Sequence, residues 1–187
     1  MAETASPGTI RRQLDFLLNG FSFYAHAERC RADDLLVRQC AADALAQAAA
    51  GVRGGIASYR QRFIPDPTRQ QPLPPAEAMA VLRALEALQA DLADLQTQVR
   101  SQPLGASDRT WARLRSAHTA LELALAFDHR LIQQADAARD ACAALDPEGL
   151  GPTPATAGPA LEAIRAQLSA VTTTLRDRAD HLAAPSA

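Results

Sequence analysis

The sequence predicts an all-α protein, an antiparallel up-and-down four-helix bundle with a long first helix. Apolar residues recur at alternating steps of three and four over long stretches, which is the pattern of one buried helix face. Proline and glycine gather in short segments that separate these stretches. At 187 residues the chain is long enough for one domain with a sizeable core. We therefore expect a single domain over residues 1–187, with disordered ends at 1–5 and 184–187.

The first helix is expected to begin at Ser6 and Pro7, which suit an N-cap and a first helical position. Its apolar stripe continues across the Asn19–Gly20 pair, so a continuous or mildly kinked helix is predicted there. Aromatic residues lie both on this stripe and beside it. A helix that is apolar on more than one side must be covered by several helices or by a second subunit. The aromatic residues of this stretch are Phe16, Phe21, Phe23 and Tyr24.

A break in the helix is predicted at Gly51, Gly54 and Gly55, because three glycines fall within five residues. A shorter helix is then expected from about Ile56 to Phe63. Residues 65–75 contain five prolines in eleven positions, which predicts an extended linker without regular hydrogen bonding.

Three further helices follow the linker. Pro75 is expected to open the second helix, and its regular apolar spacing is typical of a bundle or coiled coil. The loop at 101–107 is short enough to force an antiparallel turn. The third helix is predicted over 108–145, the segment 146–158 is predicted as a loop, and Pro159 is expected to open the fourth helix. The stripe of the second helix is Val81, Leu85, Leu88, Leu92, Leu95 and Val99, that of the third is Trp111, Leu114, Leu121, Leu125 and Ile132, and that of the fourth is Leu161, Ile164, Leu168, Val171, Leu175 and Leu182.

Composition excludes some classes of protein. A net charge of -2 and scattered arginines argue against nucleic-acid binding, which usually leaves a strong basic excess. All 19 basic residues are arginine, a bias that indicates a GC-rich bacterial genome. The alanine-rich run at 40–52 is far shorter than the roughly 20 apolar residues of a membrane span. Cys30 and Cys40 would lie about 15 Å apart along one helix, too far for a disulfide, so reduced thiols in the cytoplasm are expected.

A secretory signal is the alternative interpretation of the amino-terminal region. Arg11 and Arg12 precede an apolar stretch, and Ala25–His26–Ala27 imitates a cleavage site. Asp15 and Asn19 interrupt that stretch, however, and the helical spacing explains the same residues without cleavage. The helix is therefore preferred.

Few residues could carry chemistry. His26 and Cys30 are spaced i, i+4, as two ligands of one metal ion can be, and His118 with Glu122 repeats that spacing on the third helix. These four residues form the alternative prediction of a transition-metal or redox site. The competing interpretation makes His118 a core histidine bonded to a carboxylate and Cys30 a small apolar core residue. A carboxylate-bridged di-iron site is excluded, because no histidine follows a carboxylate by three residues.

No catalytic or cofactor-binding motif is present, so we expect neither an enzyme nor a bound cofactor. Tyr59, Arg60, Arg62 and Phe63 combine aromatics with arginines, as partner-binding segments do, although Tyr59 and Phe63 could instead fold onto the bundle as a lid. The sequence thus favours a non-enzymatic bacterial accessory or adaptor protein. It would bind a protein partner, or form a homodimer, through the apolar faces of the first helix. A metal- or thiol-dependent sensor is the alternative.

Overall fold

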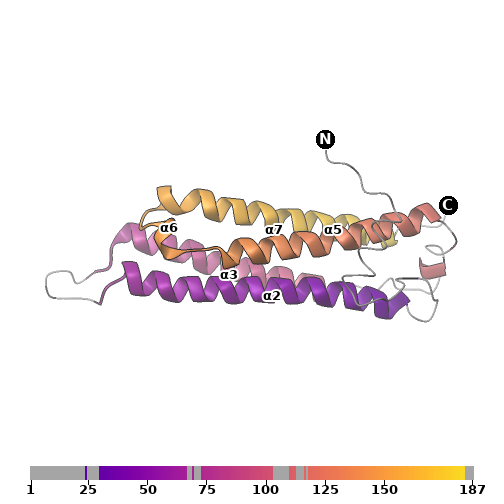
Figure 1. Ribbon diagram of the computed structural model, residues 1–187, viewed down its shortest axis with the longest axis horizontal. Helices are drawn as coiled ribbons and strands as arrows, with labels where there is room; N and C mark the ends of the chain where they lie inside the picture. The colour runs from indigo at the N-terminus through magenta and orange to yellow at the C-terminus, as the bar shows by residue number, and fades with distance from the viewer. Residues whose placement is uncertain are drawn as a thin grey trace.

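The described part of the chain is helical throughout its regular structure, which confirms the all-α class. The computed structural model describes residues 24, 30–66, 69, 73–102, 110–112, 116 and 118–183, and no β-strand occurs among them. Four long helices and one short helix have described bounds, and residues 110–112 and 116 are also helical (Figure 1). The helices with described bounds are α2 (Cys30–Phe63), α3 (Ala76–Ser101), α5 (His118–Ala143), α6 (Pro147–Leu150) and α7 (Pro154–Ala183).

The four long helices lie side by side along the length of the molecule (Figure 1). Helix α2 contacts α3 and α5, and α7 contacts the same two helices from the other side. Each long helix therefore has two long neighbours, which lets one apolar face of each point into a shared interior. None of the helices in the described ranges is both long and apolar enough to cross a lipid bilayer.

The apolar stripe predicted for the second helix forms one wall of the core. All six of its residues are buried in α3, and so are those of the predicted fourth stripe in α7. A larger core cluster joins α2, α3, α5 and α7 with Leu45, Leu88 and Leu131 among its members. A smaller cluster at one end contains Tyr24, Cys30, Trp111 and Leu125. The interior is thus divided into two apolar parts, and the boundary between them holds the polar site described below.

The first helix differs from the prediction. Tyr24 lies in a turn with φ of 57°, in the left-handed region, so one helix passing through Tyr24 is wrong at that residue. Helix α2 begins at Cys30. The predicted start at Ser6, the Asn19–Gly20 crossing and the ends at 1–5 and 184–187 lie outside the described residues.

The predicted break at the three glycines is also wrong, because α2 continues through them to Phe63. Val52 and Ile56 are buried on either side of the glycines. A Cβ built on Gly51 would lie 3.4 Å from the carbonyl oxygen of Cys142, so the lack of a side chain there suits a close approach of α5. Each glycine in a helix interior lowers helix stability by about 1 kcal/mol relative to alanine. Tertiary packing along the whole of α2 outweighs that cost.

The segment predicted as a loop at 146–158 is partly helical. The carboxylate of Asp146 accepts hydrogen bonds from the backbone N–H groups of Glu148 (3.2 Å) and Gly149 (3.3 Å), which caps α6. The hydroxyl of Thr153 accepts one from Thr156 N–H (3.3 Å) and so caps α7. Helix α7 therefore starts at Pro154, five residues before the predicted start, and Pro159 lies inside it.

Candidate functional site

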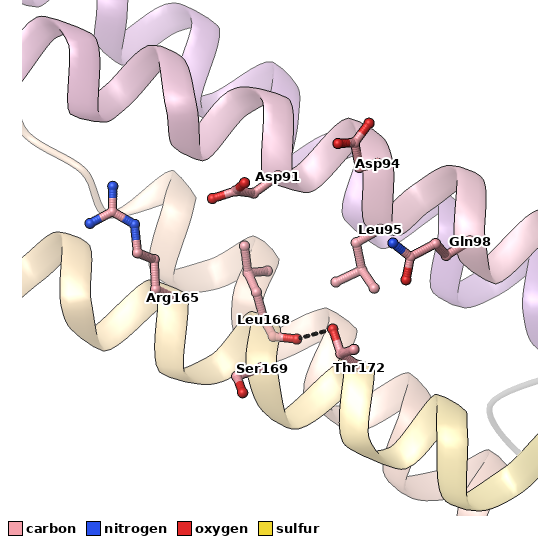
Figure 2. A pocket seen from close by; sticks show the side chains of 8 residues that line it. All are labelled: Asp91, Asp94, Leu95, Gln98, Arg165, Leu168, Ser169 and Thr172. Carbon is pink, nitrogen blue, oxygen red and sulfur yellow. Dashed lines mark hydrogen bonds between the residues drawn. The ribbon is translucent and has the colours of Figure 1, made fainter.

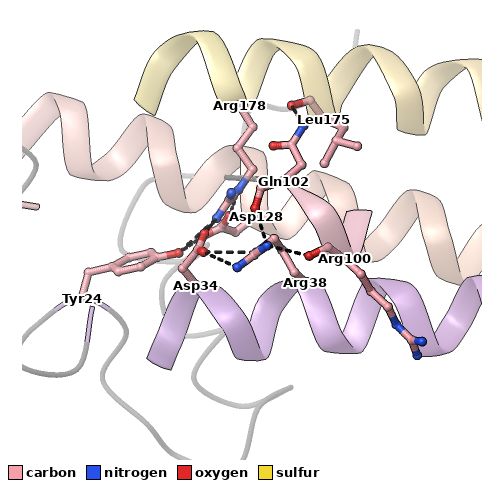
Figure 3. A network of polar contacts seen from close by, with 8 residues as sticks. All are labelled: Tyr24, Asp34, Arg38, Arg100, Gln102, Asp128, Leu175 and Arg178. Carbon is pink, nitrogen blue, oxygen red and sulfur yellow. Dashed lines mark hydrogen bonds and ion pairs between the residues drawn. The ribbon is translucent and has the colours of Figure 1, made fainter. Parts of the chain in front are cut away.

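A network of charged side chains crosses the interior where the two core clusters meet (Figure 3). Asp34 and Arg38 come from α2, Asp128 from α5 and Arg178 from α7, and each is at most 3% exposed. Two carboxylates and two guanidinium groups are present, so their charges cancel. Buried charges persist in folded proteins when they are paired and hydrogen-bonded in this way.

Asp34 joins the two arginines. Its Oδ2 accepts a hydrogen bond from Nε of Arg38 at 3.1 Å and forms an ion pair with Nη2 of the same side chain, also at 3.1 Å. Its Oδ1 accepts a hydrogen bond from Nη2 of Arg178. Because Arg38 lies on the same helix and Arg178 on α7, this single carboxylate ties α2 to α7.

Asp128 extends the network to α5. Its Oδ1 accepts a hydrogen bond from Nε of Arg178 (2.6 Å), and its Oδ2 accepts one from the hydroxyl of Tyr24 (2.6 Å). Burial raises the pKa of Asp128 above its usual value, although Arg178 and Tyr24 partly offset this effect. Burial alone would lower the pKa of Arg178, but the nearby carboxylates hold that pKa above its usual value, so the guanidinium stays charged.

Arg38 carries the network to the end of α3. Its Nη1 donates hydrogen bonds to the backbone carbonyl oxygens of Arg100 (3.1 Å) and Gln102 (2.7 Å). The last carbonyl groups of a helix lack partners within the helix, and a cation is favourable near them. The side chain of Gln102 in turn reaches the carbonyl of Leu175 on α7. All four long helices are therefore joined at this end of the molecule.

Tyr24, which precedes α2 in the sequence, joins the same network. Its ring stacks on Trp111 with centroids 5.5 Å apart, and its backbone N–H donates to Oδ2 of Asp33 at 2.7 Å. Left-handed backbone costs about 1–2 kcal/mol for a residue with a side chain. The hydrogen bonds of Tyr24 and the burial of its ring offset that cost. Burial also raises the pKa of the Tyr24 phenol well above its usual value.

The network connects the helices to one another, and its paired charged groups are typical of a structural role. Each of its four charged side chains is paired with a group of opposite charge, and each is at most 3% exposed to solvent. A general acid or base must contact the proton that it transfers. The contacts of the network therefore link α2, α3, α5 and α7 at one end of the molecule.

The residues predicted to bind a partner differ in how far they are buried, and some of them lie outside the described residues. Phe16, Phe21 and Phe23 lie outside the described residues, while Tyr24 and Tyr59 are buried. Phe63 is half-buried and contacts the ring of Tyr59 with centroids 4.9 Å apart, an arrangement that favours the lid interpretation. Arg60 and Arg62 form exposed ion pairs with Glu86 (2.5 Å) and Glu148 (3.0 Å), which tie the end of α2 to α3 and α6.

The residues of the alternative metal site are only partly described. His26 lies outside the described residues, and Cys30 is buried with its thiol 3.9 Å from the carbonyl oxygen of Tyr24. His118 is 83% exposed and pairs with Glu122 at 2.8 Å, so its predicted interior position is wrong. No three His, Cys, Asp or Glu side chains in the described ranges gather in a way that could hold a metal ion. Burial raises the pKa of the Cys142 thiol to about 11, which disfavours thiolate chemistry.

An open groove between α3 and α7 is lined by both apolar and charged side chains (Figure 2). Asp91, Asp94 and Gln98 form its α3 wall. Arg165, Ser169 and Thr172 form its α7 wall. Leu95 and Leu168 point into the space between the helices and form its floor. The groove is open to solvent and has a volume of about 360 Å³.

The charge network was not predicted from the sequence, although two charged residues on the predicted apolar stripes indicated it. Asp128 lies three residues after Leu125 and four before Ile132, on the predicted stripe of the third helix. Arg178 occupies the equivalent place between Leu175 and Leu182 in the fourth. A charged residue on an otherwise apolar stripe indicates a buried partner of opposite charge. Two such positions on separate helices could have been paired with each other.

Comparisons with known proteins identify no relative: no family model, no curated protein and no solved structure matches this chain.

Proposed function

We propose that this chain is a non-enzymatic accessory protein whose helices form an up-and-down antiparallel bundle, and that it binds another protein through the groove between α3 and α7. The groove is the observation that carries the proposal. It is lined by apolar and charged side chains from two helices that the core and the network hold in place. Binding of a partner in such a groove needs no reactive group.

Two further observations support binding over catalysis. The buried ionisable groups of the network are engaged with one another and are almost inaccessible to solvent. The thiols of Cys40 and Cys142 have raised pKa values, because burial disfavours the thiolate. The buried carboxylates and guanidinium groups of the network are therefore committed to structure, and these two thiols are held in unreactive forms. The bacterial origin, the cytoplasmic location and the homodimer remain predictions from the sequence.

The test is a comparison of surface variants in the native host. We expect the wild-type protein to retain a specific partner protein on affinity purification. The double variant Ser169→Arg/Thr172→Arg places two long side chains in the groove and should lose that partner. Thr173→Arg is the matched control, because Thr173 is exposed on α7 but does not line the groove.

Circular dichroism should show the same helix content and thermal midpoint for all three proteins. Retention of the partner by the groove variant would contradict the proposal. So would a wild-type protein that retains no partner and sediments as a monomer.

A further inference from the structure

Tyr24 is buried at one end of the bundle although it lies in a turn and not in a helix. Its side chain is 1% exposed, and its ring stacks on that of Trp111. Its hydroxyl oxygen lies 2.6 Å from Oδ2 of Asp128 and 3.4 Å from Nη2 of Arg178. Figure 3 shows the ring pointing into the charge network. Contacts with side chains of other elements therefore hold this turn in place.

The backbone of Tyr24 is fastened to the start of α2. Its N–H donates to Oδ2 of Asp33 at 2.7 Å, and its carbonyl oxygen lies 3.9 Å from the thiol of Cys30. These contacts hold the residue at φ of 57°, a left-handed conformation that is unfavourable for a residue with a side chain. The turn is therefore strained, and departure of Tyr24 from its site would relieve the strain.

The ion pairs of the network do not depend on Tyr24. Asp34 and Asp128 both pair with Arg178, and the Asp128 pair uses Oδ1, the oxygen that Tyr24 does not contact. Departure of Tyr24 would remove one donor from Asp128 and one from Asp33. Water would then reach both carboxylates and replace these donors. Opening at Tyr24 therefore separates no pair of opposite charges.

The apolar contacts of Tyr24 also lie outside the main core. Tyr24, Cys30 and Trp111 belong to the smaller apolar cluster. The larger cluster joins α2, α3, α5 and α7 and includes Cys142, but it includes none of those three residues. Proteins open locally, in units with few buried contacts, more readily than they unfold as a whole. The turn at Tyr24 has the contacts of such a unit.

We propose that Tyr24 is a latch, which opens and closes at the end of the bundle while the larger apolar cluster stays folded. In the closed form it covers the ring of Trp111 and the thiol of Cys30. In the open form these two groups and the carboxylates of Asp33 and Asp128 are accessible to solvent. A ligand that binds these groups favours the open form, because it binds only there. None of these residues lines the groove between α3 and α7, so the latch is independent of the proposed function.

Labelling of buried thiols in the native protein tests the latch, because a thiol reagent reaches a buried thiol only when the structure around it opens. Cys30 is 0% exposed in the smaller cluster, and Cys142 is 1% exposed in the larger one. Peptide mass spectrometry after reaction with N-ethylmaleimide measures each thiol separately. We expect Cys30 to react at least about tenfold faster than Cys142. Its rate should also depend less on urea, because local opening exposes less surface than global unfolding.

Two substitutions distinguish the latch from the core. Tyr24→Ala removes the latch, so the labelling of Cys30 should become about tenfold faster or more, with the helix content of the wild type by circular dichroism. Val52→Ala weakens the larger cluster, in which Val52 is fully buried. Both forms of the latch contain that cluster. Val52→Ala should therefore speed the labelling of Cys142 and leave that of Cys30 nearly unchanged.

Equal labelling rates of Cys30 and Cys142 in the wild type, with the same dependence on urea, would overturn the proposal, because Tyr24 would then leave its site only on global unfolding. Equal acceleration of both thiols by Val52→Ala would also overturn it. So would a folded Tyr24→Ala variant in which Cys30 reacts no faster, since a different part of this end would then open. The wild-type rates and Val52→Ala decide the question even if Tyr24→Ala fails to fold.

Discussion

Arg178 is the residue on which the buried network depends most, since it contacts Asp34, Asp128 and the hydroxyl of Tyr24. Its planar guanidinium presents several donors in a fixed geometry, which a lysine ammonium does not reproduce. Without it, two buried carboxylates would lose a compensating charge. Breaking a buried pair in this way costs about 3–5 kcal/mol, although an apolar replacement of the entire network could be nearly neutral. We expect the network to select one arrangement of the helices more than it adds to stability.

The two buried tyrosines provide a matched test of hydrogen bonding in the interior. Tyr24→Phe removes the donor to Oδ2 of Asp128 and leaves a buried acceptor without its partner. The free energy of unfolding should fall by about 1–3 kcal/mol. Tyr59→Phe should change it little or raise it slightly, because the Tyr59 hydroxyl is buried with no hydrogen-bond partner in the described structure.

Urea denaturation followed by circular dichroism measures both free energies of unfolding. Equal effects of the two substitutions would show that the Tyr24 hydroxyl contributes nothing specific to the network.

At the scale of elements, α2 shows how packing overrides local preference. Its 34 residues include three glycines, yet it forms one continuous helix because α3 and α5 both lie against it. Helix α7 shows the opposite case, in which local chemistry decides. The Thr153 cap and Pro154 set its first turn, and Gly151 supplies the left-handed residue that precedes it.

Replacing one glycine in α2 and one glycine before α7 by alanine tests these two explanations separately. Gly54→Ala should raise the free energy of unfolding by about 0.5–1 kcal/mol, because a Cβ there meets no atom within 4 Å and alanine favours the helix. Gly151→Ala should lower it by at least about 1 kcal/mol. Gly151 has φ of 66°, and a Cβ there would lie 2.7 Å from the hydroxyl oxygen of Thr156.

The urea midpoint of each variant relative to wild type gives these changes. A destabilising Gly54→Ala would mean that the middle of α2 is not a regular helix, and a neutral Gly151→Ala would remove the basis for the α7 start described above.

For the whole molecule, the raised pKa values predict how stability depends on pH in the alkaline range. The thiol of Cys142 has a pKa of about 11 in the folded protein against an ordinary value of 9.0, and the Tyr24 phenol lies well above its ordinary 10.0. Between the unfolded and folded pKa of each group, the folded state binds more protons than the unfolded state. Stability therefore falls as pH rises through that interval, and these groups cause no change below it.

The thermal midpoint should accordingly be insensitive to these groups below pH 9.0, decline above it and decline more steeply above pH 10.0. Scanning calorimetry across this range measures the trend. Tyr24→Phe should show a shallower decline above pH 10.0 than wild type, because one of the titrating phenols is absent. A midpoint that stays constant up to about pH 11 would contradict this account.

The sequence by itself determined the helical class and the apolar stripes of α3 and α7, because these depend on local spacing. It did not determine the continuity of α2, the turn at Tyr24 or the early start of α7. Each of these is decided by contacts or caps that spacing does not record. Only the tertiary structure decided which charged residues are buried together. Asp34, Asp128 and Arg178 are far apart in the sequence, and burial of each is stable only because folding supplies its partner from another helix.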